Sequence, residues 1–429
     1  MTRVLGKTGF RTLGIAVAAI AIIAAVVDAA PRTKLVSKTS AGAAANGNSR
    51  LSQPTAVSGN GRFVVFESVA DNLPGGAGTT QQVYLRDMRT RKTRLVSKDG
   101  NGDPLAVFNG SAGVSANGRF VAFKSEGTGL PQANGQEQVW IYDRRRNRTR
   151  LASKNGSGAP GELGSSDPAL SASGRFVAFA TPSTNMPGAE LGQTHVYVRD
   201  LERRRTVAVS KTSGGAPASG ALYGQAISSN GRRVTFYSSD EDLPGTSDGK
   251  FQHAYVRDLK RRKTYLAGRT NAGAPFDNET YNPSISGNGR FVIFEHDPGL
   301  LAVNQIYVRD LKRKRTRLAG RNNAGEPQTG GAEFAHLSGS GRYAAFVSDA
   351  ANLPGGDGST KLTYVRDLRR GKTRLASKAN GGAPADEEAT DTSISLDGRW
   401  IVFDSGADNL GGNTAVQQIF RAGPFGRRR

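Results

Sequence analysis

Cysteine is absent from this sequence of 429 residues, and histidine occurs only four times. Without cysteine there can be no disulfide, no thiolate nucleophile and no lipid-modified cysteine near the N-terminus. No Gly-x-Ser-x-Gly nucleophile elbow with a partner histidine is evident, and no glycine-rich loop has the pattern of a phosphate cradle. The chain therefore contains few of the patterns on which covalent or nucleotide-dependent catalysis depends.

Long hydrophobic runs are also missing, with one exception near the N-terminus. Residues 13–27 are apolar, three basic residues precede them, and a small-residue segment ending at Ala29 follows. This is the layout of a bacterial secretory signal peptide, and the run is shorter than the roughly 20 residues that a spanning helix needs. We expect residues 1–29 to be a signal peptide, with an uncleaved N-terminal anchor as the alternative. The protein is then exported: secreted, at the cell surface or in the periplasm.

What the chain has in abundance is repetition. The motif Ser-x-x-Gly-Arg, followed by an apolar run that ends in Phe, occurs seven times at intervals of 52 to 58 residues. Its arginines are Arg62, Arg119, Arg175, Arg232, Arg290, Arg342 and Arg399. A tandem unit of this length indicates the blades of a propeller or the turns of a solenoid.

Each unit contains four short segments with the character of β-strands. In the third unit these segments span 167–171, 175–180, 195–200 and 205–210. They are rich in β-branched and aromatic residues, and Gly, Pro and Asn separate them. Four antiparallel strands per unit, without helical periodicity, predict a propeller blade. We therefore predict an all-β fold with one seven-bladed propeller over residues 30–423 and a basic tail at 424–429. The strands are named A to D from the axis outward.

Apolar positions recur in register along the units. Strand B ends in phenylalanine in all seven units, and strand C carries a tyrosine, tryptophan or phenylalanine in all seven. We expect these rings to form the core between blades. One place in strand A holds small residues in every unit except the sixth, where His336 stands. Small side chains fit where blades converge, so this pattern places strand A next to the axis.

The last unit ends after strand C, near Phe420, without a fourth strand. A segment that matches strand D stands at the other end of the chain, at residues 32–38. Pairing of this segment with the last blade would close the ring and remove the free sheet edges. The alternative is six blades and a broken unit, which would leave residues 31–38 without a partner.

Acidic residues are scarce, with 36 against 58 lysines and arginines, and the net charge is +22. Basic residues concentrate in the six turns between strands C and D, which we expect on the same face as the A–B turns. The turns each open with an aspartate, which we expect to cap the turn by accepting hydrogen bonds from backbone N–H groups. The residues that we predict to form a cationic binding face are Arg89, Arg91, Lys92, Arg144, Arg145, Arg146, Arg203, Arg204, Lys260, Arg261, Arg262, Lys312, Arg313, Lys314, Arg369 and Arg370.

A concentrated positive face predicts an anionic partner, because long-range attraction raises association rates. We expect the partner to be an envelope protein, an anionic polymer or an anionic lipid surface. Binding to a lipid surface would make the protein peripheral to the membrane or, if the N-terminal segment is retained, anchored in it. Dedicated nucleic acid binding is not expected, because no aromatic residues alternate with the basic turns to stack on bases. We expect a monomer. The alternative explanation is that the turns are solvated hairpin tips and contain many arginines because a GC-rich genome favours arginine codons.

The units resemble the TolB-type, WD-like propeller repeat, a bacterial exported repeat whose usual form is Ser-Pro-Asp-Gly-Arg before an apolar strand. Residues 395–403, with the sequence Ser-Leu-Asp-Gly-Arg-Trp-Ile-Val-Phe, come closest to that form. The similarity covers residues 31–421 and implies a propeller that serves as an interaction platform. No partner carries over, because the founding periplasmic member has an extra N-terminal domain for which this chain has no room.

The loops between strands B and C are similar to those of exported bacterial repeats whose spaced Asp and Asn residues imply calcium ligands. Residues 71–76 and 351–358 keep that frame, but most of the acids are gone. The place two residues before the strand C aromatic holds Gln, His or Leu, and never Asp. We therefore expect no metal and no other cofactor.

Catalytic candidates are few. His195 and His253 occupy equivalent places in adjacent units, where Gln in other units indicates a neutral structural hydrogen bond. An acidic cluster at 386–388 with Asp391 has the residue type for glycoside chemistry, but adjacent acids in a Gly/Ala-rich loop are commonly solvated. We predict a non-catalytic binding platform at the bacterial cell envelope. The alternative is a polysaccharide-active hydrolase or lyase that uses the loop face opposite the basic turns.

Overall fold

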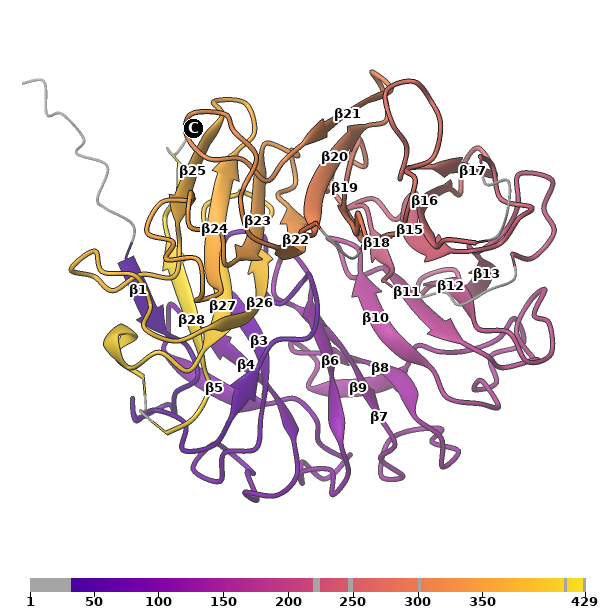
Figure 1. The fold of residues 1–429 in the computed structure, drawn as a ribbon. Coiled ribbons are helices and arrows are strands. Elements are labelled where there is room, and N and C mark those ends of the chain that lie inside the picture. The colour runs from indigo at the N-terminus through magenta and orange to yellow at the C-terminus, as the bar shows by residue number, and fades with distance from the viewer. Residues whose placement is uncertain (1–31, 219–223, 246–249, 300–301, 413–414, 427–429) are drawn as a thin grey trace, which may run out of the picture.

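The computed structural model describes residues 32–218, 224–245, 250–299, 302–412 and 415–426. Seven four-stranded antiparallel sheets surround a common axis, so the predicted seven-bladed propeller is confirmed (Figure 1). The predicted signal peptide and residues 427–429 of the predicted basic tail lie outside the described residues. No helix within the described ranges is long and apolar enough to cross a membrane.

The blades follow one another along the chain, each running from its inner to its outer strand. Blade 1 contains β2 (Ser49–Arg50), β3 (Phe63–Ser68), β4 (Gln82–Asp87) and β5 (Lys92–Leu95). Blade 2 contains β6 (Asn109–Val114), β7 (Phe120–Ser125), β8 (Gln138–Asp143) and β9 (Arg148–Leu151). Blade 3 contains β10 (Ser166–Leu170), β11 (Phe176–Thr181), β12 (His195–Asp200) and β13 (Arg205–Ala208). Blade 4 contains β14 (Ala226–Ile227), β15 (Arg233–Ser238), β16 (His253–Asp258) and β17 (Lys263–Leu266).

The remaining blades complete the ring. Blade 5 contains β18 (Thr280–Ile285), β19 (Phe291–His296), β20 (Gln305–Asp310) and β21 (Arg315–Leu318). Blade 6 contains β22 (Ala332–Leu337), β23 (Tyr343–Ser348), β24 (Leu362–Asp367) and β25 (Lys372–Leu375). Blade 7 contains β26 (Ala389–Ile394), β27 (Ile401–Ser405), β28 (Gln418–Gly423) and β1 (Arg32–Leu35), with the short 3-10 helix η1 (Asp408–Leu410) before β28.

The ring closes through the N-terminal strand. β1 pairs antiparallel with β28, and in Figure 1 the indigo strand lies beside the yellow blade. The hydroxyl of Thr33 donates to the backbone oxygen of Lys378 at 2.6 Å, in the connector that follows β25. Thr316 of blade 5 donates to the connector of blade 4 in the same way. β1 therefore behaves as a regular outer strand, and the alternative of six blades is wrong.

The predicted aromatic layers form the core. Phe66 of strand B stacks on Tyr84 of strand C with ring centroids 5.6 Å apart, and equivalent pairs recur in other blades. Along the axis the last aliphatic residue of each inner strand points into the channel. This ring of Val, Leu and Ile narrows the channel at the end where the A–B turns lie. Strand A is thus innermost, as predicted.

The repeated motif locks each blade to the one before it. Ser115 accepts a hydrogen bond from the backbone N–H of Phe120 at 2.9 Å and closes the turn. Gly118 has φ of 67°, and a Cβ there would lie 1.9 Å from the ring of Phe63 in blade 1. The same close approach joins Gly61 to Trp400, Gly174 to Phe120, Gly231 to Phe176, Gly341 to Phe291 and Gly398 to Tyr343. Only glycine fits both the backbone and the space.

Candidate functional site

The A–B and C–D turns lie side by side on one face of the propeller, which we call the turn face. In blade 1 the backbone N–H of Met88 donates to the backbone oxygen of Arg62 at 2.8 Å, and an equivalent bond occurs in blades 2 to 6. In blade 7 Pro424 stands at this place, and the next residue, Phe425, donates to the backbone oxygen of Arg399 instead. Arg32 at the start of β1 is paired with Gly423 at the end of β28. Both ends of the described chain therefore reach the turn face.

The aspartate that opens each C–D turn has two sets of partners. Asp143 accepts a hydrogen bond from the backbone N–H of Arg145 at 3.0 Å, which is the predicted cap. It also accepts from Nε of Arg119 at 2.9 Å and from its Nη2 at 2.6 Å, a pair that sequence reasoning missed. Equivalent bidentate pairs join Arg62 to Asp87, Arg175 to Asp200, Arg232 to Asp258, Arg290 to Asp310 and Arg342 to Asp367.

These pairs decide the charge balance of the turn face. Burial by itself raises the pKa of Asp143, but the hydrogen bonds from Arg119 and the turn N–H groups outweigh it, and the pKa lies below its usual value. The aspartates are therefore ionised, and their charge is cancelled by the repeat arginines. The lysines and arginines of the turns themselves form no ion pair among the described residues, and Glu202 of the blade 3 turn is paired with the repeat arginine Arg175.

Of the sixteen basic residues that the sequence predicted for this face, fifteen lie in the C–D turns and Lys92 begins β5, and all but one of the sixteen are exposed. None of the sixteen forms an ion pair with an acid among the described residues. The half-buried one is Arg144, whose Nε donates to the backbone oxygen of Gly118 at 2.8 Å. Its guanidinium also lies 4.5 Å from the ring centre of Phe63, so Arg144 packs between blades 1 and 2.

Four C–D turns hold a basic residue in the left-handed backbone region. These residues are Arg91, Arg204, Arg262 and Lys314, with φ of 54–59°. Asn147 and Gly371 occupy the same place in blades 2 and 6, and both types adopt this backbone at lower cost. The basic side chains thus stand where local stability favours Gly or Asn. This placement argues against codon composition as the whole explanation of the basic turns.

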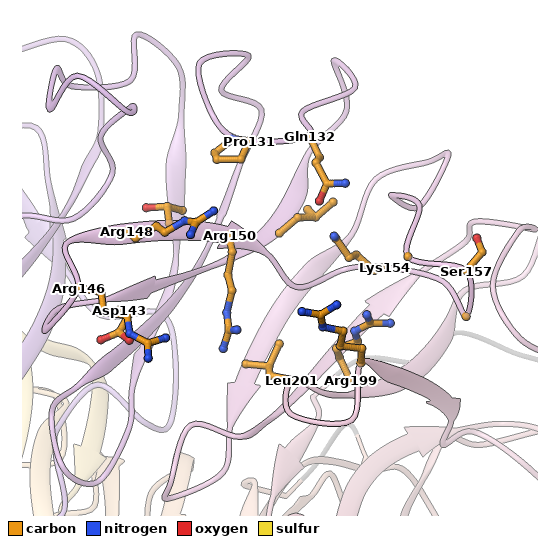
Figure 2. A pocket seen from close by; sticks show the side chains of 15 residues that line it. Pro131, Gln132, Asp143, Arg146, Arg148, Arg150, Lys154, Ser157, Arg199 and Leu201 are labelled. Atoms are coloured by element: carbon orange, nitrogen blue, oxygen red, sulfur yellow. The ribbon is translucent and has the colours of Figure 1, made fainter.

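A groove with a volume of 780 Å³ lies between blades 2 and 3 on the outer rim. Figure 2 shows Arg150 of β9 and Lys154 of the following connector extending into the space between the two blades, with Arg199 of β12 on the far side. Arg146, Arg148 and Arg204 also line this blade 2–3 groove. The carboxylate among the lining residues is Asp143, which Arg119 already binds.

The cations of the blade 2–3 groove repel one another. Burial lowers the pKa of Lys154, and the charges of Arg199, Arg204 and Arg150 lower it further. Burial also lowers the pKa of Arg150. An anion that entered the groove would relieve both the repulsion and the desolvation. The sequence prediction did not include Arg148, Arg150, Lys154 or Arg199, although the alternation Arg-Thr-Arg in β9 places both its arginines on the solvent side.

A second groove of the same kind, with a volume of 680 Å³, lies between blades 5 and 6. Its cations outside the repeat pairs are Arg313, Arg315, Arg317 and Arg369. The two grooves are three blades apart on the rim, so cationic hollows occur at more than one place around the turn face.

The histidines have structural surroundings. His195 is buried at the start of β12, its Nδ1 lies 3.5 Å from Oγ of Ser210, and burial lowers its pKa. In blade 1 Gln82 takes this place, accepts from Ser97 and donates to the backbone oxygen of Leu105. The predicted neutral hydrogen bond is therefore confirmed for His195. His253 is buried at the equivalent place in β16.

The predicted acidic cluster divides in two. Residues 386–388 are exposed, and Asp386 accepts a hydrogen bond from the backbone N–H of Asp408 at 3.0 Å. Asp391 instead belongs to β26 and lines the mouth of the central channel, together with His336. The interpretation as a solvated loop is thus wrong for Asp391. Within the described ranges, no three His, Asp or Glu side chains are grouped so that they could hold a metal ion.

Comparison with known proteins places the chain by its fold. No family model and no curated protein sequence matches it. An oligogalacturonate lyase in complex with manganese is 11% identical with a TM-score of 0.57, covering 92% of this chain and 96% of that chain. The β-propeller domain of the Trilobed protease from Pyrococcus furiosus, described as an open velcro topology, is 12% identical with a TM-score of 0.52, covering 89% and 97%.

TolB from Acinetobacter baumannii is also similar, with 14% identity, a TM-score of 0.43 and coverage of 85% and 80%. At these identities the likenesses establish the propeller fold alone. They include both enzymes and TolB, so they leave the activity of this chain to its own residues.

Proposed function

We propose that this protein is an exported, non-catalytic propeller that binds an anionic polymer of the cell envelope through its turn face. The observation that supports this most directly is the uncompensated charge. The turn aspartates are bound by the repeat arginines, and the turn lysines and arginines have no acidic partner among the described residues. A face of this kind attracts polyanions over a distance and binds them at contact.

The shape of the face favours a chain-like ligand over a flat one. Arg150, Lys154 and Arg199 line the blade 2–3 groove, and a ligand reaches the half-buried Lys154 and the buried Arg199 only by entering the space between blades. A bilayer would meet the hairpin tips and leave the groove empty. An extended polymer with phosphate or carboxylate groups can lie along the groove and satisfy several cations at once.

The test is co-sedimentation of residues 30–429 with immobilised polyphosphate, immobilised polygalacturonate and neutral dextran, and with anionic and neutral vesicles, across a NaCl series. We expect binding to the two polyanions that falls steeply with salt, and no binding to dextran. If the protein preferred anionic vesicles over both polymers, its ligand would be a lipid surface and not a polymer. No binding at low salt would overturn the proposal and reduce the turns to solubility features.

Two pairs of substitutions separate the groove from the general charge of the face. Arg146→Glu with Arg148→Glu is expected to weaken polymer binding at least ten-fold. Arg261→Glu with Arg262→Glu makes the same charge change on the blade 4 turn and is expected to weaken it less. The control Arg146→Lys with Arg148→Lys keeps the charge and should stay within about three-fold of the wild type. If the two Glu variants lost polymer affinity equally, the groove would contribute no more to binding than the other basic turns.

The same polygalacturonate tests the alternative function. One similar structure is an oligogalacturonate lyase, and a polysaccharide-active enzyme on the opposite face would shorten the polymer. We expect its chain length to stay constant during incubation, as measured by size-exclusion chromatography. Shortening that persists in the Arg261→Glu, Arg262→Glu variant would favour an enzyme over a binding platform.

A further inference from the structure

The central channel has a second hollow at the end opposite the turn face. Inner-strand residues eight positions before each repeat arginine stand at this end, far from the A–B turns. They and their neighbours enclose a pocket of 270 Å³, which we call the channel-mouth pocket. Its side chains come from six blades, and the ones used below are Asp167, Gln225, Phe334, His336 and Asp391. This pocket plays no part in the proposed function.

The lining of the channel-mouth pocket offers acceptors and no cations. None of the described residues that line it is a lysine or an arginine, although the chain contains 58 of these residues. Asp167 and Asp391 contribute carboxylates, and neither is ion-paired with a described residue. Gln225 is only 3% exposed, and its Oε1 has no hydrogen-bond partner among the described residues, while its Nε2 donates to the backbone oxygen of Asp167. Nδ1 of His336 also lacks a partner within the part of the chain that the structure describes.

A buried amide oxygen without a partner is uncommon, because no hydrogen bond compensates for the free-energy cost of removing it from water. Gln225 cannot turn its amide over without losing the bond to Asp167, so its Oε1 stays buried and without a partner among the described residues. A ligand with N–H groups could donate the hydrogen bond that this oxygen lacks. The carboxyl of Asp391 is also a buried polar group that a ligand could stabilise. Burial and the neighbouring Asp404 raise its pKa well above the usual range. A cation beside it would stabilise the ionised form.

An aromatic ring is held at the same place by strained backbone. Phe334 has φ of 52°, which is an outlier for a bulky side chain. Ser111, Asp167 and Asn282 have the same conformation at the equivalent positions of blades 2, 3 and 5. Glu295 of blade 5 accepts the backbone N–H of Phe334 at 2.8 Å and holds this conformation. Strain of this kind persists where the surrounding structure imposes it, and it often accompanies binding sites.

We propose that the channel-mouth pocket binds the guanidinium group of an arginine side chain presented by a partner peptide. The guanidinium is planar and has five N–H donors, which match two carboxylates and an amide oxygen. Its face stacks on aromatic rings, which Phe334 supplies. The absence of lysine and arginine from the lining leaves no competing cation. The volume of 270 Å³ suits one such side chain and excludes a folded domain.

The test is calorimetric titration with the peptide acetyl-Gly-Arg-Gly-amide and with its citrulline and lysine counterparts. Citrulline has the shape of arginine without the charge, so it isolates the electrostatic contribution. We expect the arginine peptide to bind at least ten-fold more tightly than the citrulline peptide, and the lysine peptide to lie between them. Equal binding of the arginine and citrulline peptides, or no binding of either, would overturn the proposal. Equal binding of the lysine peptide would overturn the assignment to a guanidinium.

Variants link the binding to the pocket. Asp391→Asn keeps the shape and removes the charge, and it is expected to weaken arginine binding about ten-fold. Phe334→Gly removes the ring and suits the left-handed backbone, so it should fold at least as stably while binding more weakly. Glu387→Gln, in the exposed loop nearby, is the matched control and should bind as the wild type. Wild-type affinity in both pocket variants would contradict the site.

The two proposals fail separately. The variant Arg261→Glu with Arg262→Glu changes the turn face and leaves the channel mouth intact, so it should bind the arginine peptide with unchanged affinity. Asp391→Asn should bind polyanions as the wild type does. Loss of arginine binding in the turn-face variant would show that the peptide contacts a different surface.

Discussion

Arginine occurs in three different environments in this propeller, and its place in the repeat determines which. Six of the seven repeat arginines, such as Arg119, are bound to the aspartate of the same blade, and Arg399 of blade 7, where β28 ends without an aspartate, is the exception. The arginines near the end of strand C bridge blades: Nη1 of Arg86 donates to Thr93 at 2.6 Å and to the backbone oxygen of Lys38 at 2.9 Å. The turn arginines face solvent. The aspartates cancel the charge of the repeat arginines that they bind, so net charge alone overstates what the molecule can offer to a ligand.

Asp258 should be among the most stability-sensitive of the paired aspartates. Its side chain is fully enclosed, and Arg232 and Arg233 both bind it. Removing it with Asp258→Ala leaves a partly buried Arg232 without its partner, and we expect a loss of about 3 kcal/mol in the free energy of unfolding. Chemical denaturation measures this. Lys260→Ala, in the same turn, is the control and should change stability by less than about 0.5 kcal/mol. A loss as small as that of the control would show that the pair is not structural.

The left-handed turn residues allow stability and binding to be separated. Replacing Arg91, Arg204, Arg262 and Lys314 together by Gly should relieve their backbone cost, whereas replacing them by Ala should not. Both variants lose the same four charges, so polyanion binding should weaken equally. We expect the Gly variant to be more stable than the Ala variant by about 2 kcal/mol in total. Equal thermal midpoints would contradict the strain that these φ values indicate.

Glu295 should make the propeller less stable as the pH rises. Burial raises the pKa of its carboxyl to about 8, compared with 4.5 for an unperturbed glutamate. The folded protein therefore keeps a proton that the unfolded chain releases, and the free energy of unfolding falls between these two pH values. Glu295→Gln cannot titrate, so its thermal midpoint should exceed that of the wild type by more at pH 8.5 than at pH 5. A difference that does not change with pH would contradict the buried carboxyl.

At the scale of the element, strand C was the easiest to predict, and the pairing register of the inner strand A was the hardest. The predicted strand at 195–200 coincides with β12, because alternating apolar residues and a terminal aspartate mark both its ends. The inner strands carry a register shift in blades 2, 3, 5, 6 and 7. Their residues face the channel and the neighbouring blades rather than one core. Apolar and polar residues do not alternate along the inner strands, so the register shifts could not be predicted from the sequence.

The N-terminal strand should behave as part of blade 7. A chain that begins at residue 39 lacks β1 and exposes the edge of β28, along with the carbonyl of Lys378 that Thr33 binds. We expect a clearly lower thermal midpoint and faster proteolysis within residues 389–426 than in a chain that begins at residue 31. Limited proteolysis with mass spectrometry identifies the cut sites. Identical midpoints and cleavage patterns in the two chains would show that closure adds no stability.

At the scale of the whole molecule, the charge should oppose folding at low salt. The net charge is +22, and the free turn cations repel one another on one face. Added NaCl screens this repulsion and should raise the thermal midpoint. Polyphosphate at the same ionic strength should raise it further, because a ligand that binds the folded state stabilises it. A midpoint that falls with NaCl, or that polyphosphate leaves unchanged, would contradict the proposed turn face.

The sequence by itself determined the repeat, the number of blades, the closing strand and the gathering of basic turns on one face. These follow from local patterns that each unit repeats, and from the one segment that completes the ring. Only the tertiary structure decided which charges are free, because the Arg–Asp pairs join strands B and C across about 25 residues. It also decided the blade 2–3 groove and the channel-mouth pocket. Asp167 and Asp391 line one pocket because closing the ring brings the inner strands of distant blades around one axis.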